Sequence, residues 1–390
     1  MNVLVNNLLR STAAALCAAA GLISCASEQE CYPTPVILIS DLYYPGQDVG
    51  DNFDVVTPFA LDRINLRGII FDITQRFRRE ADVRAAAREP GFIPVTQLNF
   101  AFGRNVPCAC SPFTPMRSPD DRMEDLPNFQ QTGFELFFRL LCESERPVEV
   151  ISTGSCRLLA AAYNRNPELM RRKIAAIHLS AGASSDTFRE WNIDLDTLAA
   201  YRLLTSDLRI NLYPCATADG PFDKGENNTF WSLDKLDFVL EMEPMLRNYI
   251  VFAFLHKNRT DYLSYMENPL PSEDEAAFRN YRIDRWFGSG GCHYIWETSL
   301  WQQAAGLALV QQAGEAWRLI PREQAAPNDR IFDEGLHPVT VTATPDGLFR
   351  FAPTDEPSNF NIYYRSSPEL HQQALREALP ALYKSYRIEH

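Results

Sequence analysis

Short apolar runs that alternate with helix-like segments are the feature that most constrains the fold of this chain. Two of these runs, VILIS at residues 36–40 and RGIIFDI at residues 67–73, are continuously apolar. Strands show this pattern when both of their faces are covered, as in parallel sheets. The alternation of strands and helices therefore predicts an α/β fold with a mainly parallel central sheet and helices on both faces.

Periodicity and turn residues predict the individual elements. Strands are expected at residues 36–40, 66–73, 95–102, 148–152 and 175–181, and helices at residues 53–63, 129–144 and 156–174 with a break at Pro167. Near the end of the chain, Pro345-Asp346-Gly347 predicts the turn of a hairpin. A capping Ser followed by Pro368 predicts a final helix that packs on the same domain. Residues 36–390 are thus expected to form one domain.

The first residues have the pattern of an export signal. A single positive charge, Arg10, precedes an Ala/Leu-rich run at residues 13–23 that is too short to span a bilayer. The run ends in Leu22-Ile23-Ser24-Cys25, which resembles the bacterial lipobox. We therefore expect a signal peptide at residues 1–24, a tether at residues 25–35, and a periplasmic or cell-surface lipoprotein anchored at Cys25. The alternative is an ordinary secretory signal that is cleaved nearby.

Charge and cysteine content narrow the class of partner. The chain of 390 residues has a formal net charge of −13, which disfavours a nucleic acid polymer or an anionic membrane surface as partner. A small molecule is the more suitable ligand, and membrane contact is expected only through the lipid anchor. The sequence leaves the oligomeric state open, and a homo-oligomer is one possibility. No cysteine pair has zinc-binding spacing. Cys142, Cys156 and Cys215 lie in apolar runs and are expected to be buried.

Four aspartates follow the first predicted strand: Asp41, Asp48, Asp51 and Asp54. Like charges at short distance repel each other unless a cation or hydrogen-bond donors offset the repulsion. Thr153-Gly154 directly follows another predicted strand, and in parallel sheets ligands bind beyond the carboxyl ends of the strands. Carboxylate and carbonyl oxygens are the ligands that calcium prefers. The pattern predicts a site for a hard cation at this edge.

Three segments in order resemble the inosine-uridine-preferring nucleoside hydrolase family. ILISDLYYPGQDVGDNFDVV resembles its first-strand aspartate motif, VEVISTGSCRLLAAAYNRNPELMRRKIAAIHLSAGA its T-G-P-L-T-N-L-A region, and REWNIDLDTLAAYRLLTSDLRINLYPCATAD its E-F-N segment. The resemblance implies an exported hydrolase that uses Ca²⁺ to activate water against the N-ribosidic bond of a nucleoside-like compound.

The resemblance also assigns roles by position. Asp41 matches the aspartate that binds calcium and accepts the proton of the attacking water. Glu190 and Asn192 match residues that bind the ribose hydroxyls. The family has a further ribose contact after the second strand, where this chain offers Asp72 and Thr74 as replacements. The remaining metal positions fall on Asp48, Asp51, Asn52, Thr153 and Glu297.

The sequence departs from the family pattern at several of these positions. Ile39 and Asn52 replace aspartates, so Asp48 or Asp54 is expected to restore the lost charge. Trp296 stands where the family has a histidine that protonates the base, which leaves His293 as the candidate acid and Trp296 as a residue that stacks on the base. The alternative to catalysis is a ribosyl-binding protein that kept the fold and lost part of the site.

Overall fold

The computed structural model describes residues 32–45, 49–74, 89–281 and 292–388, and all of these from Pro33 onward belong to the compact unit Pro33–His390. Its central sheet has the strand order β15-β14-β16-β8-β7-β6-β1-β3-β5, and every neighbouring pair from β16 to β5 is parallel. This arrangement confirms the predicted α/β fold. The strands are β1 (Thr34–Ser40), β3 (Ile64–Phe71), β5 (Cys108–Cys110), β6 (Val148–Ser152), β7 (Ile174–Leu179), β8 (Ile210–Leu212), β14 (Glu334–Ala343), β15 (Phe349–Pro353) and β16 (Phe360–Arg365).

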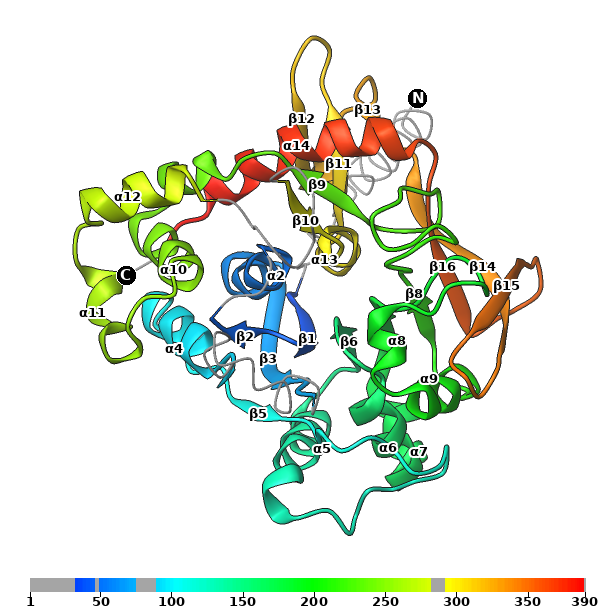
Figure 1. Ribbon diagram of the computed structural model, residues 1–390. Coiled ribbons are helices and arrows are strands. Elements are labelled where there is room, and N and C mark those ends of the chain that lie inside the picture. Colours follow the sequence, from blue (N-terminus) through cyan, green and yellow to red (C-terminus); the bar gives the residue numbers. More distant parts are fainter. Residues whose placement is uncertain (1–31, 46–48, 75–88, 282–291, 389–390) are drawn as a thin grey trace, which may run out of the picture. The chain divides into compact units, whose positions relative to one another are not determined.

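The sheet is buried on both faces, as the continuous apolar runs predict. Val36 and Leu38 of β1 belong to one hydrophobic core, whereas Ile37 and Ile39 of the same strand belong to another. Successive side chains of a strand point to opposite faces, so each core fills one side of the sheet. Figure 1 shows the helices on both sides of β1 and β3.

The helices divide between the two cores. The first core contains residues of α2 (Val49–Ala60), α4 (Phe92–Ala101), α10 (Pro244–Phe254), α12 (Ser272–Arg279), α13 (Thr298–Ala305) and α14 (Pro368–Ser385). The second contains residues of α5 (Thr132–Glu143), α6 (Arg157–Arg165), α7 (Pro167–Lys173), α8 (Trp191–Asp194) and α9 (Thr197–Leu204). The short helix α11 (Ser264–Glu267) lies beside α10. None of the described helices combines the length and the apolar character that a membrane crossing needs.

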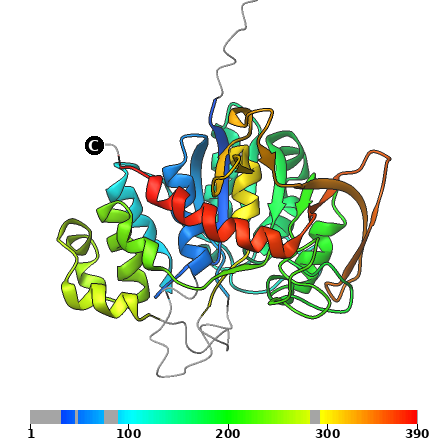
Figure 2. The same ribbon diagram turned by 90° about the horizontal axis from the view of Figure 1, so that it is seen from above.

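The final part of the chain extends the sheet and covers one of its sides. β14 pairs antiparallel with both β15 and β16, which forms the predicted hairpin with Gly347 at a φ of 87° in its turn. Helix α14 begins at the cap Ser367 with Pro368 at its first position, as predicted, and packs along β12 (Trp317–Pro321) (Figures 1 and 2). β12 pairs with β11 (Leu307–Gln311), which also pairs with β13 (Arg330–Ile331).

Two further small sheets complete the described elements. β9 (Trp231–Leu233) pairs with β10 (His293–Ile295), and β2 (Tyr43–Tyr44) pairs with β4 (Glu89–Pro90). The one-turn 3-10 helices are Asn128–Gln130, Asp237–Glu241, Arg259–Asp261 and Arg322–Gln324.

Three sequence predictions are wrong. Residues 95–102 were expected to form a strand, but most of them lie in helix α4, where Val95, Leu98 and Ala101 are buried at helical spacing. The helix expected at residues 53–63 is present as α2, but it spans Val49–Ala60, so Asp51 lies within the helix as Asp54 does. Cys142 is exposed near the end of α5, whereas Cys156 and Cys215 are buried as predicted.

Candidate functional site

The carboxyl ends of the parallel strands meet at one edge of the sheet. Backbone bonds join Asp72 N to Ser40 O (2.8 Å), Thr153 N to Ile39 O (2.9 Å) and Ser180 N to Ser152 O (2.9 Å). The residues that follow β1, β3, β6 and β7 are therefore neighbours. This places the half-buried Asp41 on the edge that carries Asp72 and Thr153.

Asn192 joins two of these strand ends. Its Nδ2 donates to the carbonyl oxygens of Thr153 (3.3 Å) and Ser180 (3.0 Å). The amide group is more than nine-tenths buried, and its Oδ1 accepts no hydrogen bond from the described residues. A buried acceptor without a donor costs free energy, so this oxygen is suited to a hydroxyl or N–H group of a ligand.

Glu190 is held directly beside Asn192. It caps α8, its two oxygens accept from Asn192 N (3.0 Å each), and Oε2 also accepts from Gly182 N (2.8 Å). Burial raises the pKa of the Glu190 carboxyl to about 7, against the opposing effect of these backbone N–H groups. Oε2 already accepts two of these bonds, so Oε1 is the oxygen that can accept a further hydrogen bond.

Three predicted site residues converge on one thiol. Burial raises the pKa of Cys215 well above its usual range, and the negative charges of Glu190, Glu297 and Asp41 raise it further. The geometry links two of these residues to the thiol. Cys215 N donates to Gly182 O (2.9 Å) and Gly182 N donates to Glu190 Oε2 (2.8 Å), whereas Glu297 directly follows Trp296, which packs in the same cluster as Cys215. The Cys215 Sγ also lies 3.3 Å from Ser180 Oγ, next to the carbonyl to which Asn192 donates. Asp41, Glu190, Asn192, Cys215 and Glu297 therefore form the acidic centre.

The polar residues of α2 that were predicted to bind the metal or to restore its lost charge face other helices. Asn52 Oδ1 accepts from the Tyr249 hydroxyl (3.0 Å), and Asp54 Oδ1 accepts from Trp301 Nε1 (3.1 Å). Both side chains are buried, as is Asp51, whose charge raises the pKa of Tyr249 after the larger effect of burial. Asp48 lies outside the described residues. Asn52 and Asp54 thus contact α10 and α13.

The described residues do not complete a metal centre by themselves. Within residues 32–45, 49–74, 89–281 and 292–388, no three His, Cys, Asp or Glu side chains are grouped to hold a metal ion. The carbonyl oxygen of Thr153, a predicted ligand, accepts a hydrogen bond from Asn192 Nδ2. The donor set described here therefore does not fit a resident calcium without further oxygens.

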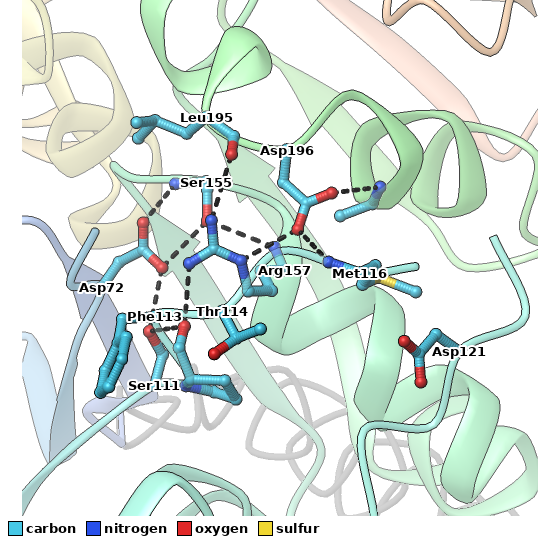
Figure 3. Close-up of polar contacts among 12 residues, drawn as sticks. Asp72, Ser111, Phe113, Thr114, Met116, Asp121, Ser155, Arg157, Leu195 and Asp196 are labelled. Atoms are coloured by element: carbon cyan, nitrogen blue, oxygen red, sulfur yellow. Dashed lines mark hydrogen bonds and ion pairs between the residues drawn. The ribbon is translucent and has the colours of Figure 1, made fainter. Parts of the chain in front are cut away.

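Asp72 belongs to a buried polar network rather than to an open pocket (Figure 3). Its Oδ1 accepts from Ser111 Oγ (3.0 Å) and Ser155 Oγ (2.9 Å), and its Oδ2 accepts from Ser155 N (2.7 Å). Burial raises the Asp72 pKa, whereas Arg157 and the Ser155 bonds lower it. A Cβ added to Gly154 would lie 2.8 Å from Asp72, so this turn needs glycine. Asp72 therefore fixes the loop that follows β6.

Arg157 extends this network across the sheet edge. Its Nε pairs with Asp196 Oδ2 (2.9 Å) (Figure 3). Its Nη1 donates to the carbonyls of Pro112 (2.8 Å) and Ile73 (3.2 Å). The Arg157 and Asp196 side chains are both buried. One guanidinium therefore ties together the segments that follow β3, β5 and α8.

Trp296 lies in a cluster of aromatic rings. Its Nε1 donates to Pro221 O (3.2 Å), and its ring packs on Phe230 at 5.4 Å between centroids. His293 begins β10 and is buried, with its ring nearly parallel to that of Tyr281 at 6.2 Å. Glu297 Oε2 accepts from Trp296 N (3.0 Å).

The sequence did not indicate several members of this region. Cys215 was expected only as a buried apolar residue, and Phe222, Phe230 and Arg157 were not singled out. The basic residue inside the otherwise apolar segment CRLLAAAY was the available signal for a buried ion pair. Nothing local marks the two phenylalanines, because the tertiary structure alone brings them to Trp296.

Comparison with known proteins finds nucleoside hydrolases. No family model matches the chain. Pyrimidine-specific ribonucleoside hydrolases RihA from Escherichia coli strains SMS-3-5 / SECEC and O81 (strain ED1a) are each 37% identical to it over 83 residues, which is 20% of this chain. The chain spans 26% of the length of these curated relatives.

Solved structures of nucleoside hydrolases also match the chain, at lower sequence identity. An inosine-uridine preferring nucleoside hydrolase from Bacillus anthracis has a TM-score of 0.43 at 13% identity and covers 86% of this chain and 95% of its own. A purine-preferring ribonucleoside hydrolase from Gardnerella vaginalis has a TM-score of 0.45 at 13% identity, with coverage of 90% and 99%. At these scores the structural likenesses carry no argument about the site. The sequence likeness agrees with the resemblance that the motifs indicate.

Proposed function

We propose that this protein is an N-glycosyl hydrolase that cleaves the N-ribosidic bond of a nucleoside-like small molecule. The observation that carries the proposal is the acidic centre, in which Glu190 is fixed beside the buried Asn192 Oδ1 and Asp41 follows β1 at the same edge of the sheet. The motifs that resemble nucleoside hydrolases supply Asp41, Glu190 and Asn192, and the likeness to ribonucleoside hydrolases supports the same reaction class.

In the proposed reaction, Asp41 accepts a proton from the water that attacks the anomeric carbon. A carboxylate at a strand end in a partly buried site is a suitable general base. Glu190 and the Asn192 oxygen accept hydrogen bonds from ribose hydroxyls and hold the ring for attack. Positive charge develops on the sugar as the C–N bond breaks, and the surrounding carboxylates stabilise it.

Calcium is proposed as the activator of the attacking water. Asp41 and Asp51 are its candidate ligands, with Glu297 as a third carboxylate. Calcium prefers six to eight oxygens, so water, backbone oxygens or further side chains would have to complete the shell. When bound, it would polarise the attacking water and lower the pKa of that water.

The alternative is a ribosyl-binding protein without activity. Two observations favour it: Asn52 and Asp54 bond to Tyr249 and Trp301, and no three-ligand metal cluster occurs among the described residues. Such a protein would use Glu190 and Asn192 to bind the sugar without hydrolysing it.

Release of ribose from p-nitrophenyl riboside distinguishes the two functions. We expect turnover by the wild-type protein and a loss of about 10²- to 10⁴-fold in Asp41→Ala, the usual contribution of a general base. Asp120→Asn, which removes a side chain that is 89% exposed, is the control and should be unaffected. His293→Ala should reduce turnover of natural nucleosides more than that of the activated riboside. If a folded sample with calcium releases ribose from neither substrate, the binding function replaces the enzymatic one.

A further inference from the structure

Four aromatic side chains form a wall beside the acidic centre. Phe222, Phe230, Tyr294 and Trp296 lie with ring centroids 4.9 to 6.3 Å apart. None of the four belongs to either of the two large hydrophobic cores. Three of the rings are buried, whereas Phe222 is 43% exposed. Among these four rings, Phe222 is therefore the one that is partly exposed.

The wall is held in place from behind. The Trp296 indole donates to Pro221 O. Tyr294 is the central residue of β10 and lies opposite Ser232 of the paired strand β9. Arg365 donates from Nη1 to Phe230 O (3.0 Å) and from Nη2 to Asn228 Oδ1 (2.9 Å). Such a fixed aromatic surface can stack on a flat ring with little loss of side-chain entropy.

The wall and the acidic centre are continuous through Cys215. This residue packs in the same cluster as Phe230, Tyr294 and Trp296. On the other side, Cys215 N donates to Gly182 O and Gly182 N donates to Glu190 Oε2, and Glu297 Oε2 accepts from the backbone N of Trp296 in the wall itself. Faces of aromatic rings attract cations, and carboxylates add a negative potential. The combination favours a flat ring that is positively charged.

We infer that the substrate is an N-ribosyl compound whose leaving group is a cationic heteroaromatic ring, of the N-ribosyl pyridinium class. This inference rests on the proposed function and names its substrate. Water forms the new C–O bond at the anomeric carbon, and its proton passes to Asp41. The electron pair of the broken C–N bond returns to the ring nitrogen, so the ring leaves as a neutral molecule. The products are ribose, the neutral heterocycle and one proton.

The same chemistry disfavours ordinary nucleosides. A neutral purine or pyrimidine leaves as an anion unless an acid protonates it. The Trp296 indole, which stands at the position of the acid in the resemblance, has no readily transferable proton. A developing anion would also be repelled by the neighbouring carboxylates. A cationic ring avoids both costs because its departure removes positive charge from the ring.

The test compares three substrates: N-ribosyl nicotinamide as the cationic riboside, uridine as a neutral nucleoside, and p-nitrophenyl riboside as a neutral activated riboside. We expect kcat/KM for N-ribosyl nicotinamide to exceed that for uridine by at least about 100-fold. Phe222→Leu keeps the apolar contact but removes the aromatic face, and it should raise KM for the cationic substrate by about two- to fivefold. Phe129→Leu, at another exposed phenylalanine, is the matched control.

The outcomes separate the two proposals. Hydrolysis of p-nitrophenyl riboside with no preference for the cation over uridine would overturn the inference and leave the proposed function intact. If no riboside is hydrolysed, the proposed function fails, and calorimetric titration then decides the ligand class. Binding of N-ribosyl nicotinamide at least tenfold tighter than uridine, weakened in Phe222→Leu, would support the cationic ligand; equal binding, or none, would overturn it.

Discussion

The buried carboxyl of Glu190 should make the stability of this protein depend on pH. Burial raises its pKa from 4.5 to about 7 in the folded protein. Between these values the unfolded chain has released the proton while the folded protein still holds it. The folded state then binds more protons, so the free energy of unfolding falls as pH rises and becomes constant above about pH 7. The contribution of Glu190 is therefore fully present below about pH 4.5 and lost above about pH 7.

The size of this effect follows from the shift in pKa. A shift from 4.5 to about 7 corresponds to about 3 kcal/mol over the full range, at 1.36 kcal/mol for each pKa unit. Between about pH 5 and pH 8 the expected change is about 2 to 3 kcal/mol. This is a large fraction of the stability of a typical domain.

Glu190→Gln isolates the contribution. Glutamine keeps the shape and one acceptor but cannot ionise, so it should cost about 1 to 3 kcal/mol for one lost backbone hydrogen bond at every pH. Urea unfolding of both proteins at several pH values gives the difference in their free energies of unfolding. We expect the variant to gain about 2 to 3 kcal/mol relative to wild type between about pH 5 and pH 8.

Other carboxyl groups titrate equally in both proteins and cancel in this difference. Glu143→Gln, on a half-exposed position of α5, is the control that removes one carboxylate in contact with water. A difference between wild type and Glu190→Gln that stays constant across the pH range would refute the argument. The Glu190 carboxyl would then ionise alike in the folded and unfolded chains.

Three further predictions concern other parts of the chain. Arg157→Met leaves Asp196 buried without its partner and should lower the free energy of unfolding by about 3 to 5 kcal/mol in urea titration, so a loss below about 1 kcal/mol would contradict the importance of the pair. Saturating calcium should raise the melting temperature of wild type but not of Asp41→Asn, because a ligand that binds only the folded state stabilises it; identical curves with calcium and with chelator would exclude a calcium site. Cells fed a fatty-acid analogue should label wild type but not Cys25→Ala, and label that persists in the variant would rule out lipidation at Cys25.

The local pattern of the sequence determined most of the secondary structure. The continuously apolar runs gave β1 and β3 as strands buried on both faces, and β6 has the predicted bounds Val148–Ser152. Turn and cap residues gave the C-terminal hairpin and the start of α14. These predictions succeed because side-chain alternation, turn geometry and helix capping depend on residues close together in the chain. The strand predicted at residues 95–102 is wrong because the apolar content of this segment suits a strand, and only packing against the surrounding core selects the helix.

Only the tertiary structure decided which polar residues meet. The sequence placed Asp41 and Thr153 at strand ends, and the parallel register brings those ends together. It could not show that Asp72 is enclosed by Ser111 and Ser155, nor that Asn52 and Asp54 contact α10 and α13. Cys215 likewise gains its carboxylate neighbours from β1, α8 and α13, which are far apart in the chain. Such contacts depend on how helices and loops pack over the sheet, and no local pattern of residues encodes that packing.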